Sequence, residues 1–437
     1  MWLLALTFVA ATLLLSWMMA GYLVWLRLAG GPRRPAPERA SDERPVLSVV
    51  IPCFNEADLI EDKLANVLSC RYPADRVEIV FADGGSSDGT VERLERALPG
   101  DRQVRLVRCP RPGKINQINH VLPGLRGSIV VNSDVDARLD AGALLSIADE
   151  FADRPAAAVV GACCSPLNGM RIEQCYWTAQ NRCRVMESNV AFASVVIAGC
   201  YAFRRDLLSR FPEDVVADDA YVAALANSLG YETVYSQRAT ARELRAPQTL
   251  FDFLTHKFRK SNAVLRETLR FAYRMPDLSP RWRLILLTRL GQLLCMPWVA
   301  AVWTLAAAAL AIGQQYDLVG FGTLWLGLWV VAARAALTHV DLPEGHDGNF
   351  GWWTTIQGYV CTMAVVLAAG MSYPFFRQGS CYARLGQATR QGAGQADGDS
   401  GHASDLPADS TRRRERRLPA ERSPALAPPP PFGAQPA

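Results

Sequence analysis

The sequence predicts an α/β fold, with a Rossmann-like, mostly parallel sheet in one domain and transmembrane helices on both sides of that domain. Two observations predict the sheet: short apolar runs recur within residues 46–249, and amphipathic helical patterns separate them. A third observation predicts the membrane helices, because residues 1–26, 290–316 and 351–376 carry no charged side chain. The chain therefore combines a sheet domain with a membrane region.

The apolar runs alternate with helical patterns in a regular order. Residues 46–51 fit a buried strand, and Asn55 can then cap a helix. The apolar stripe of that helix consists of Ile60, Leu64, Val67 and Leu68. Further strands are expected at residues 77–82, 104–107, 128–133, 156–161, 196–203 and 231–235, and further helices from residue 90 and at residues 114–122, 176–189 and 217–229.

The composition excludes several classes of protein. The chain has 437 residues, of which 50% are hydrophobic and 20% charged, and its net charge is only +4. Its basic residues are not interleaved with aromatic ones, so a nucleic-acid partner is not expected. The 11 cysteines lack the Cys-x-x-Cys spacing of zinc sites, and we expect reduced thiols in the core rather than disulfides.

Charges beside the apolar segments predict the topology. The first segment is followed by Arg27, Arg33 and Arg34. Because basic residues stay on the cytosolic side, we expect an integral protein of a bacterial-type inner membrane with the sheet domain in the cytosol. Arg334 and His339 interrupt residues 318–340, which we expect at the interface or as a re-entrant segment. The arginine-rich tail then stays cytosolic; a break of residues 284–316 at Pro297 is an alternative.

These features divide the chain into six parts. We expect a transmembrane helix at residues 1–28, a linker at 29–45, the sheet domain at 46–249, an amphipathic interfacial region at 250–283, a membrane region at 284–376 and a disordered basic, Pro-rich tail at 377–437. The prediction of the interfacial region depends on residues 250–270. Phe251, Leu254 and Phe258 alternate there with basic side chains, as in helices that bind a membrane surface.

Two aspartates follow the central strand and indicate a cation site. Asp134 and Asp136 come directly after the strand expected at residues 128–133, and because successive side chains of a strand point to opposite faces, their i, i+2 spacing places them on one face, where they can converge on one cation. Magnesium is held by one or two carboxylates together with diphosphate oxygens, and open α/β sheets bind nucleotides at such strand ends. Turn aspartates exposed to solvent have the same spacing, so the pair alone does not decide.

The order of six motifs along the chain indicates a specific protein family. They are Val49 to Glu56, Asp83 to Thr90, Gly113-Lys114 with Asn119, Asp134-Val135-Asp136, Gly199 to Arg204, and Asp218-Asp219. In this order, residues 46–270 resemble the membrane-integrated, inverting family-2 glycosyltransferases with the GT-A fold. The resemblance implies an enzyme that transfers a sugar from a nucleotide-diphosphate sugar, with Mg²⁺ or Mn²⁺ as cofactor and a lipid or glycan as acceptor.

The resemblance also implies roles for single residues. Pro52, Asn55 and Glu56 would line the nucleotide pocket, Asp83 would bind the uracil edge, and Lys114 would neutralise the diphosphate. Asp134 would contact the ribose or sugar, and it would hold the metal together with Asp136. Asp218 and Asp219 match the acidic pair of the family, with Asp219 as general base. Ordinary alternatives are a turn-capping Asp83, a solvated Lys114 and an N-capping acidic pair.

One departure from the family pattern bears on the acceptor. The membrane members carry Gln-x-x-Arg-Trp, whereas this chain has His256, Arg259 and Lys260 at those positions. Arg259 can still pair with a phosphate of the donor, but the aromatic face for an acceptor sugar is missing unless Phe258 or Trp177 supplies it. This favours a single transfer to a lipid-linked acceptor. The alternatives are a processive polysaccharide synthase and a catalytically silent membrane assembly partner.

Overall fold

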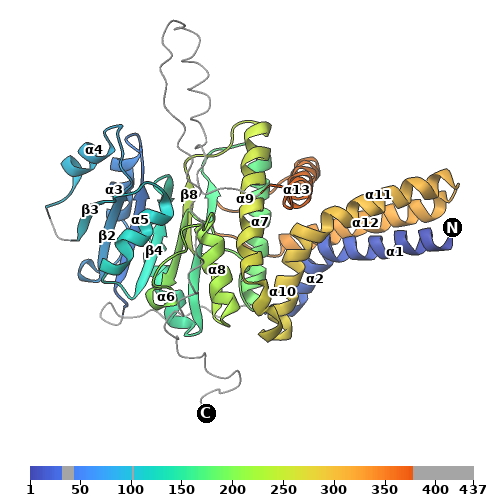
Figure 1. Cartoon of the computed structure of the whole chain (residues 1–437), viewed down its shortest axis with the longest axis horizontal. Helices are drawn as coiled ribbons and strands as arrows, with labels where there is room; N and C mark the ends of the chain where they lie inside the picture. Colours follow the sequence, from blue (N-terminus) through green and yellow to red (C-terminus); the bar gives the residue numbers. More distant parts are fainter. Residues whose placement is uncertain (32–43, 101–102, 377–437) are drawn as a thin grey trace, which may run out of the picture. The chain divides into compact units, whose positions relative to one another are not determined.

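The first half of the sheet consists of parallel strands. The computed structural model of the chain describes residues 1–31, 44–100 and 103–376 (Figure 1). Strands β1 (Leu47–Cys53), β2 (Val77–Asp83), β3 (Val104–Arg108) and β4 (Ile129–Ser133) are all parallel, in the order β3-β2-β1-β4. Valine and isoleucine fill the middle positions of β1, and valine those of β4, because both faces of these two strands are buried. Their carboxyl ends therefore lie at one edge.

The second half of the sheet is mixed. After β4 the order continues as β7 (Cys200–Arg204), β6 (Ala157–Pro166), β8 (Glu232–Glu243) and β5 (Ala137–Leu139). Strand β7 is antiparallel to both neighbours and β5 to β8, whereas β6 and β8 are parallel. The prediction of a mostly parallel α/β sheet is confirmed, with these antiparallel pairs as the addition that the sequence did not indicate.

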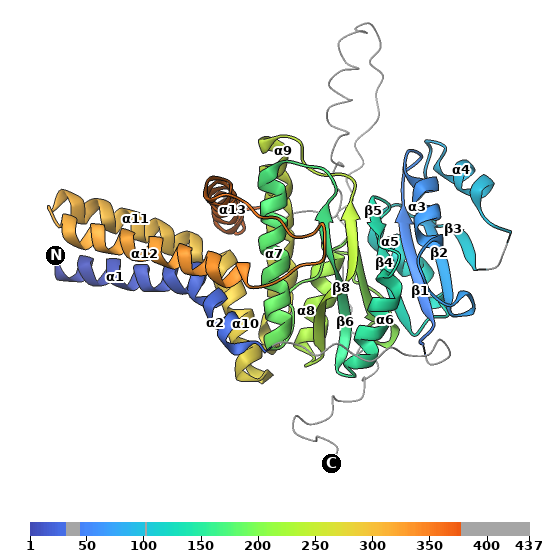
Figure 2. The same ribbon diagram turned by 180° about the vertical axis from the view of Figure 1, so that it is seen from behind.

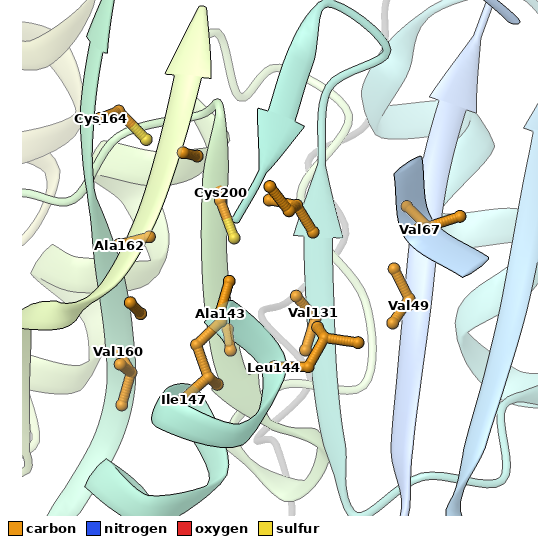
Figure 3. Close-up of a cluster of buried hydrophobic side chains, with 14 of the residues drawn as sticks. Val49, Val67, Val131, Ala143, Leu144, Ile147, Val160, Ala162, Cys164 and Cys200 are labelled. Atoms are coloured by element: carbon orange, nitrogen blue, oxygen red, sulfur yellow. The ribbon is translucent and has the colours of Figure 1, made fainter. Parts of the chain in front are cut away.

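Helices cover both faces of this sheet. They are α3 (Ile60–Leu68), α4 (Thr90–Ala97), α5 (Lys114–Val121), α6 (Ala143–Asp153), α7 (Arg171–Val190), α8 (Asp218–Ser228) and α9 (Leu250–Arg270), with short 3₁₀ turns η3 (Ala74–Arg76), η4 (Leu122–Gly124), η5 (Arg205–Leu207) and η6 (Ala272–Asp277). Figure 3 shows Ile147 of α6 and the thiols of Cys164 and Cys200 in the apolar core of the sheet. The cysteines described by the structure are free thiols, as expected.

Several boundaries differ from the prediction. Helix α6 was not expected, although Ala143, Leu144 and Ile147 are buried on one face, because Gly142 and the preceding loop obscure its start. Residues 196–199 form a turn rather than the start of β7, since the Ala198 N–H donates to the Asp219 carboxylate at 2.9 Å. Strand β8 runs on to Glu243, well beyond the expected end at residue 235.

Within the described residues, four apolar helices are long enough to cross a membrane. The first consists of α1 (Trp2–Ser16), the π-helical turn η1 (Trp17–Gly21) and α2 (Tyr22–Ala29). The second consists of α10 (Pro280–Leu290), the π-helical turn η7 (Gly291–Cys295) and α11 (Met296–Ile312). The third and fourth are α12 (Tyr316–Thr338) and α13 (Trp352–Ser372). Most of the expected linker and the whole of the expected tail at 377–437 lie outside the described residues.

Helix α12, which contains most of the residues 318–340 expected at the interface or as a re-entrant segment, packs with two other apolar helices. It packs against α1 and α11, and the three run side by side in Figures 1 and 2. A Cβ at Gly322 would lie 2.6 Å from the Phe8 ring, so the missing side chain permits close packing of α12 on α1. Trp325 also donates to the Ser16 hydroxyl at 3.0 Å. Helix α12 also has the length and apolar composition of a membrane span, and the expected interfacial or re-entrant position of residues 318–340 stays a prediction.

Helix α9 has the predicted bounds, but part of its basic face points inward. The Lys257 ammonium is buried and lies 2.8 Å from the buried Glu173 carboxylate of α7. The rings of Tyr176, Trp177 and Phe253 surround it at 4.2 to 5.5 Å. Lys257 therefore joins α9 to α7 and cannot bind lipid headgroups, because its charge is satisfied inside the protein.

Candidate active site

The two aspartates of the predicted cation site lie in a turn after β4. The strand ends at Ser133, and the Ala137 N–H donates to the Asp134 carbonyl at 3.1 Å to close the turn. The expectation that strand geometry aligns Asp134 and Asp136 is therefore wrong, although both are only partly buried. The buried Lys63 supports this turn from behind, since its ammonium donates to the Ser133 hydroxyl at 2.8 Å and to the Ala137 carbonyl at 2.5 Å.

Lys114 connects this turn to the predicted acidic pair. Its ammonium lies 2.8 Å from an Asp134 carboxylate oxygen and 3.0 Å from an Asp218 carboxylate oxygen. Asp218 is buried and also accepts a hydrogen bond from the Tyr201 hydroxyl at 2.6 Å. Three segments that are distant in the sequence, at residues 114, 134 and 218, therefore meet at one point. Lys114 is not the solvated helix-start lysine that was the ordinary alternative.

Negative charge predominates at this point. Burial works against the charged form of Lys114, but Asp134 and Asp218 together raise the pKa of its ammonium. Burial raises the pKa of the Asp134 carboxyl, and the neighbouring Asp136 and Asp218 raise it further, against the attraction of Lys114. One ammonium thus does not balance the carboxylates around it, and the site favours an additional cation.

Asp219 lies beside this cluster at the start of α8. Its carboxylate accepts from the backbone N–H groups of Ala198 at 2.9 Å and Ala220 at 2.8 Å, which fixes its orientation. Burial raises the pKa of Asp219, and the charge of Asp218 raises it further, while Lys260 and Lys114 oppose this shift. A partly exposed carboxyl with a raised pKa is a suitable proton acceptor.

Asp83 and Asn55 lie at the ends of the neighbouring strands β2 and β1. The buried Asp83 carboxylate accepts from the N–H groups of Gly85 at 2.9 Å and Ser86 at 3.1 Å, which is the turn-capping arrangement. Asn55 has a φ of 55° and receives the Ser87 N–H at 2.9 Å. Asp88 accepts from the Ala57 N–H and the Thr90 hydroxyl, as expected of a turn residue.

Helix α5 connects these strand ends to the carboxylate cluster. Lys114 begins the helix, and Gln117 one turn later donates to the carbonyls of Cys53 at 2.5 Å and Ala82 at 2.9 Å. Gly84 must lack a side chain, because a Cβ there would lie 2.6 Å from the Gln117 amide nitrogen. Pro52 is the penultimate residue of β1, so it shares this edge. Asn119 instead holds the loop before α8, through the backbone of Phe211 at 2.8 Å.

Sequence reasoning missed several supporting residues. Lys63 belongs to α3, and no pattern in the sequence distinguishes it from a surface lysine. Glu56 was expected to line the nucleotide pocket, but its partner Arg245, 2.7 Å away, was not anticipated. The hydroxyl of Tyr201 on Asp218 could have been sought in the motif Gly199 to Arg204, because β7 begins at Cys200 beside this cluster.

Trp177 and Phe258 were considered as substitutes for the missing tryptophan that would stack on an acceptor sugar, but both rings already pack against other side chains. Trp177 is 3% exposed, and its indole N–H donates to Glu173 at 2.7 Å. The Phe258 ring stacks on Phe376 with centroids 6.1 Å apart. Arg259 lies partly buried on α9 beside His256, whose pKa is lowered by burial and by nearby basic groups. This part of the site therefore contains the neutral His256 imidazole and the cations of Arg259 and Lys260, and neither Trp177 nor Phe258 offers an unobstructed aromatic face to a sugar.

The donor atoms of the site fit a hard divalent cation that binds together with a diphosphate. Within residues 1–31, 44–100 and 103–376, no three or more His, Cys, Asp or Glu side chains form a complete cage. Asp134 and Asp136 instead offer carboxylate oxygens on one turn, where the raised pKa of Asp134 reflects excess negative charge. Magnesium-type sites of this kind complete their coordination with substrate phosphate oxygens and water.

Comparison with known proteins assigns this part of the chain. Residues 48–210, which include β1 to β7 and both aspartates of the turn, match the model of the glycosyl transferase family 2. Residues 48–210 therefore form a family-2 glycosyltransferase domain. The matched range ends before Asp219, so the role of that residue in the domain rests on the geometry described above.

Curated relatives of the domain are distant in sequence. An N-acetylglucosaminyltransferase of Rhizobium meliloti (strain 1021) is 23% identical over 303 residues, which cover 64% of this chain and 71% of the relative. A second, from Mesorhizobium japonicum, is 24% identical over 52% of this chain and 57% of its own length. A poly-beta-1,6-N-acetyl-D-glucosamine synthase of Staphylococcus aureus (strain MSSA476) is 29% identical over 27% of this chain and 28% of its own length.

A solved structure extends the likeness to most of the chain. The mannosyltransferase PcManGT from Pyrobaculum calidifontis, in complex with GDP-Man and Mn²⁺, superposes with a TM-score of 0.62. The superposition covers 85% of this chain and 98% of that protein at 24% identity. The family-2 domain therefore has the GT-A fold.

Proposed function

We propose that the chain is a membrane-anchored, inverting glycosyltransferase. It moves a sugar from a nucleotide-diphosphate sugar, most simply a UDP-sugar, to a lipid or lipid-linked acceptor at the cytosolic face of the membrane. The observation that carries this proposal is the Lys114 ammonium between Asp134 and Asp218, with Asp219 directly beside them. A cation-binding turn, a phosphate-binding lysine and a proton acceptor are the groups that such a transfer needs.

The donor would be held from two sides. Lys114 and Arg259 pair with the diphosphate, while Asn55, Glu56 and Asp83 lie at the strand ends where a nucleoside would bind. Asp134 and Asp136 would hold Mg²⁺ or Mn²⁺, which stabilises the charge that develops on the departing nucleoside diphosphate. When the cation binds, Asp134 would contact it and lose part of its ion pair with Lys114.

Asp219 would remove the proton from the acceptor hydroxyl. The N–H groups of Ala198 and Ala220 hold its carboxylate in place, so it would need no reorganisation when the acceptor arrives. Attack by the hydroxyl on the anomeric carbon and departure of the nucleoside diphosphate then occur in one displacement. The proposal includes no covalent intermediate between the sugar and the enzyme.

Two features guide the choice of substrates. The printed names of the relatives make N-acetylglucosamine the first sugar to test, as its UDP derivative. The similarity to the staphylococcal synthase supports a second candidate function, the processive synthesis of a polysaccharide. Against processivity, the Trp177 ring is closed by Glu173 and Lys257, and Lys260 occupies the position of the family tryptophan.

Sugar transfer by the purified full chain tests the proposal. The chain is incubated in lipid with Mg²⁺ or Mn²⁺, labelled UDP-GlcNAc, UDP-glucose or GDP-mannose, and a bacterial lipid extract, and the products are sized. We expect a short lipid-linked product with one of the UDP-sugars. A long polymer would favour the second candidate. Absence of transfer from every donor would contradict the proposal and favour a silent assembly partner.

A further inference from the structure

Three of the four apolar helices form one bundle whose ends are aligned. At one end, Phe8 of α1 contacts Ala306 and Leu310 of α11, and a Cβ at Gly313 would lie 2.9 Å from the Met1 methyl group. At the other end, one apolar cluster contains residues from the sheet domain and from all three helices, among them Tyr22 of α2, Leu286 of α10 and Ala336 of α12. The first end is therefore remote from the sheet domain, and the second end adjoins it.

Helix α13 contacts this bundle near both of its own ends. Near its start, Thr355 accepts a hydrogen bond from Arg334 of α12, whose guanidinium also lies 4.6 Å from the Trp352 ring centroid. Near its end, a Cβ at Gly370 would collide with the Leu293 carbonyl and lie 2.8 Å from the Pro297 ring. The two contacts thus connect α13 to α12 and to the junction of η7 with α11.

The two contacts lie at nearly the same depth along the bundle. At a rise of 1.5 Å per residue, Arg334 is about 27 Å from the remote end of α12 at Tyr316. By the same measure, Pro297 is about 22 Å from the remote end of α11 at Ile312. Thr355 and Gly370 are themselves about 22 Å apart along α13. A helix with such contacts runs across the bundle, and in Figures 1 and 2 α13 is viewed end-on while α1, α11 and α12 are viewed from the side.

The faces of α13 differ in what they contact. One face packs on the family-2 domain: a Cβ at Gly358 would lie 3.6 Å from the Cys175 sulfur of α7, and Phe376 beyond the helix accepts from Asn262 of α9 at 3.2 Å. Another face is apolar and exposed over its whole length. This stripe consists of Trp353, Ile356, Val360, Ala364 and Met371, which follow each other at helical spacing.

We propose that α13 is an interfacial helix that lies in the cytosolic leaflet, so that the described chain crosses the membrane three times. The occupant of its exposed stripe is the lipid of that leaflet. A hydrocarbon core is about 30 Å thick, so helix contacts about 22 to 27 Å from the remote end lie at the inner boundary of the bilayer. Tryptophans such as Trp353 prefer this boundary.

The charges of the sequence agree with this topology. Three crossings place the first residue outside and the segment after residue 376 in the cytosol. That segment contains Arg377, Arg384, Arg390 and the triplet Arg412-Arg413-Arg414, as expected for cytosolic residues. A fourth crossing by α13 would export these arginines. The helix that does not cross is therefore α13, whereas the sequence alone had suggested residues 318–340.

Depth measurements on the full chain in lipid vesicles test this proposal. Nitroxide labels are attached to Ile356→Cys, Ala364→Cys and Met371→Cys, one at a time, in a background with Cys295, Cys361 and Cys381 replaced by serine. We expect equal and shallow depths at the three positions. A transmembrane α13 would instead place the label at residue 364 about 3 Å from the bilayer midplane and the label at 356 about 9 Å from it, a depth difference of about 6 Å, because these residues lie two and six positions from the middle of the helix.

Control labels on α11 show that the method resolves a crossing helix. Leu305→Cys should be about 10 Å deeper than Ile312→Cys, because seven residues of α11 separate them. A reporter fused after Ala437, either alkaline phosphatase or a fluorescent protein, locates the end of the chain independently. Fluorescence without phosphatase activity supports three crossings. A deeper label at 364 or an active phosphatase would overturn the proposal.

Discussion

At the scale of single residues, the raised pKa of Asp219 predicts the pH dependence of transfer. A general base must be ionised, so the rate should fall as the pH decreases through the pKa of Asp219. Burial and Asp218 raise that pKa, and the fall should therefore begin above the ordinary aspartate value of about 4. Lys260 lowers the pKa, so Lys260→Gln should shift the acidic limb of kcat/KM to higher pH. Lys260→Arg keeps the charge and should leave the limb in place; an unchanged limb in Lys260→Gln would contradict this assignment.

Asp136 gives a second prediction at this scale. If its carboxylate holds the divalent cation, Asp136→Ala should weaken the binding of UDP in the presence of Mn²⁺ by about 10- to 100-fold, while the weak binding without metal stays the same. Calorimetric titrations of UDP with and without Mn²⁺ measure this difference. Asp75→Ala, an exposed aspartate 82% accessible, is the matched control. Equal metal-dependent affinity in Asp136→Ala and the parent would exclude Asp136 as a ligand.

The sequence predicted which residues belong to the site better than it predicted their contacts. Lys114, Asp134 and Asp218 do meet, although the strand geometry used to align Asp134 with Asp136 is replaced by a turn. Lys63 could not be predicted, because its burial depends on α3 packing behind that turn. Long-range contacts of this kind have no signal in a single sequence. The donor-binding roles of Pro52, Asn55, Glu56, Asp83 and Arg259 stay predictions.

At the scale of helices and strands, the buried ion pair between α7 and α9 should be important for stability. Lys257→Met leaves the Glu173 carboxylate buried without its cation, which costs about 3 to 5 kcal/mol. The double variant Glu173→Gln/Lys257→Met removes both charges and should recover much of this loss. Thermal unfolding of the parent, Lys257→Met, Glu173→Gln and the double variant in detergent measures the coupling. Arg210 and Glu213 form an exposed pair, so Arg210→Met should change stability by less than about 1 kcal/mol. Additive effects at Glu173 and Lys257 would contradict the coupling.

Strands and helices could be predicted from the sequence where a single pattern of apolar residues identified them. Strands β1, β2 and β4 are buried on both faces, so continuous apolar runs marked them within two residues of their ends. The basic pattern of α9 gave its bounds but not its orientation, because a lysine that faces Glu173 has the same spacing as one that faces lipid. The pairing of β7 with β4 and β6 was not predictable, since direction depends on the path of the chain between strands.

At the scale of the whole molecule, Glu187 joins the long apolar helices to the family-2 domain. This fully buried carboxylate of α7 accepts from Tyr22 of α2 and from Arg289 of α10, each at 2.6 Å. Arg289→Met should therefore destabilise the protein by about 3 kcal/mol, because the carboxylate loses its cation. Arg283→Met, on the exposed side of α10, is the control and should have little effect. Equal unfolding temperatures for the two variants would show that this contact does not hold the parts together.

The proposed topology differs from the one expected from the sequence in a single helix. Charge counting indicated that one apolar segment does not cross, and Arg334 and His339 pointed to residues 318–340, whereas we propose that α13 is this segment. Arg334 was taken as an obstacle to crossing, whereas it lies near the end of α12 that adjoins the sheet domain and contacts the start of α13. Hydropathy cannot distinguish a helix within a bilayer from one that covers a protein and a lipid surface together, because both present apolar residues.

Transfer by the Asp219→Asn variant tests the central claim most directly. The variant keeps the size of the side chain and removes the base, so we expect transfer from UDP-sugar to fall by about 100- to 10,000-fold. Calorimetry should show unchanged UDP affinity, and Asp206→Asn, an exposed aspartate before α8, should retain full activity. Transfer at the parental rate by Asp219→Asn would contradict the account of this carboxylate cluster as the catalytic centre.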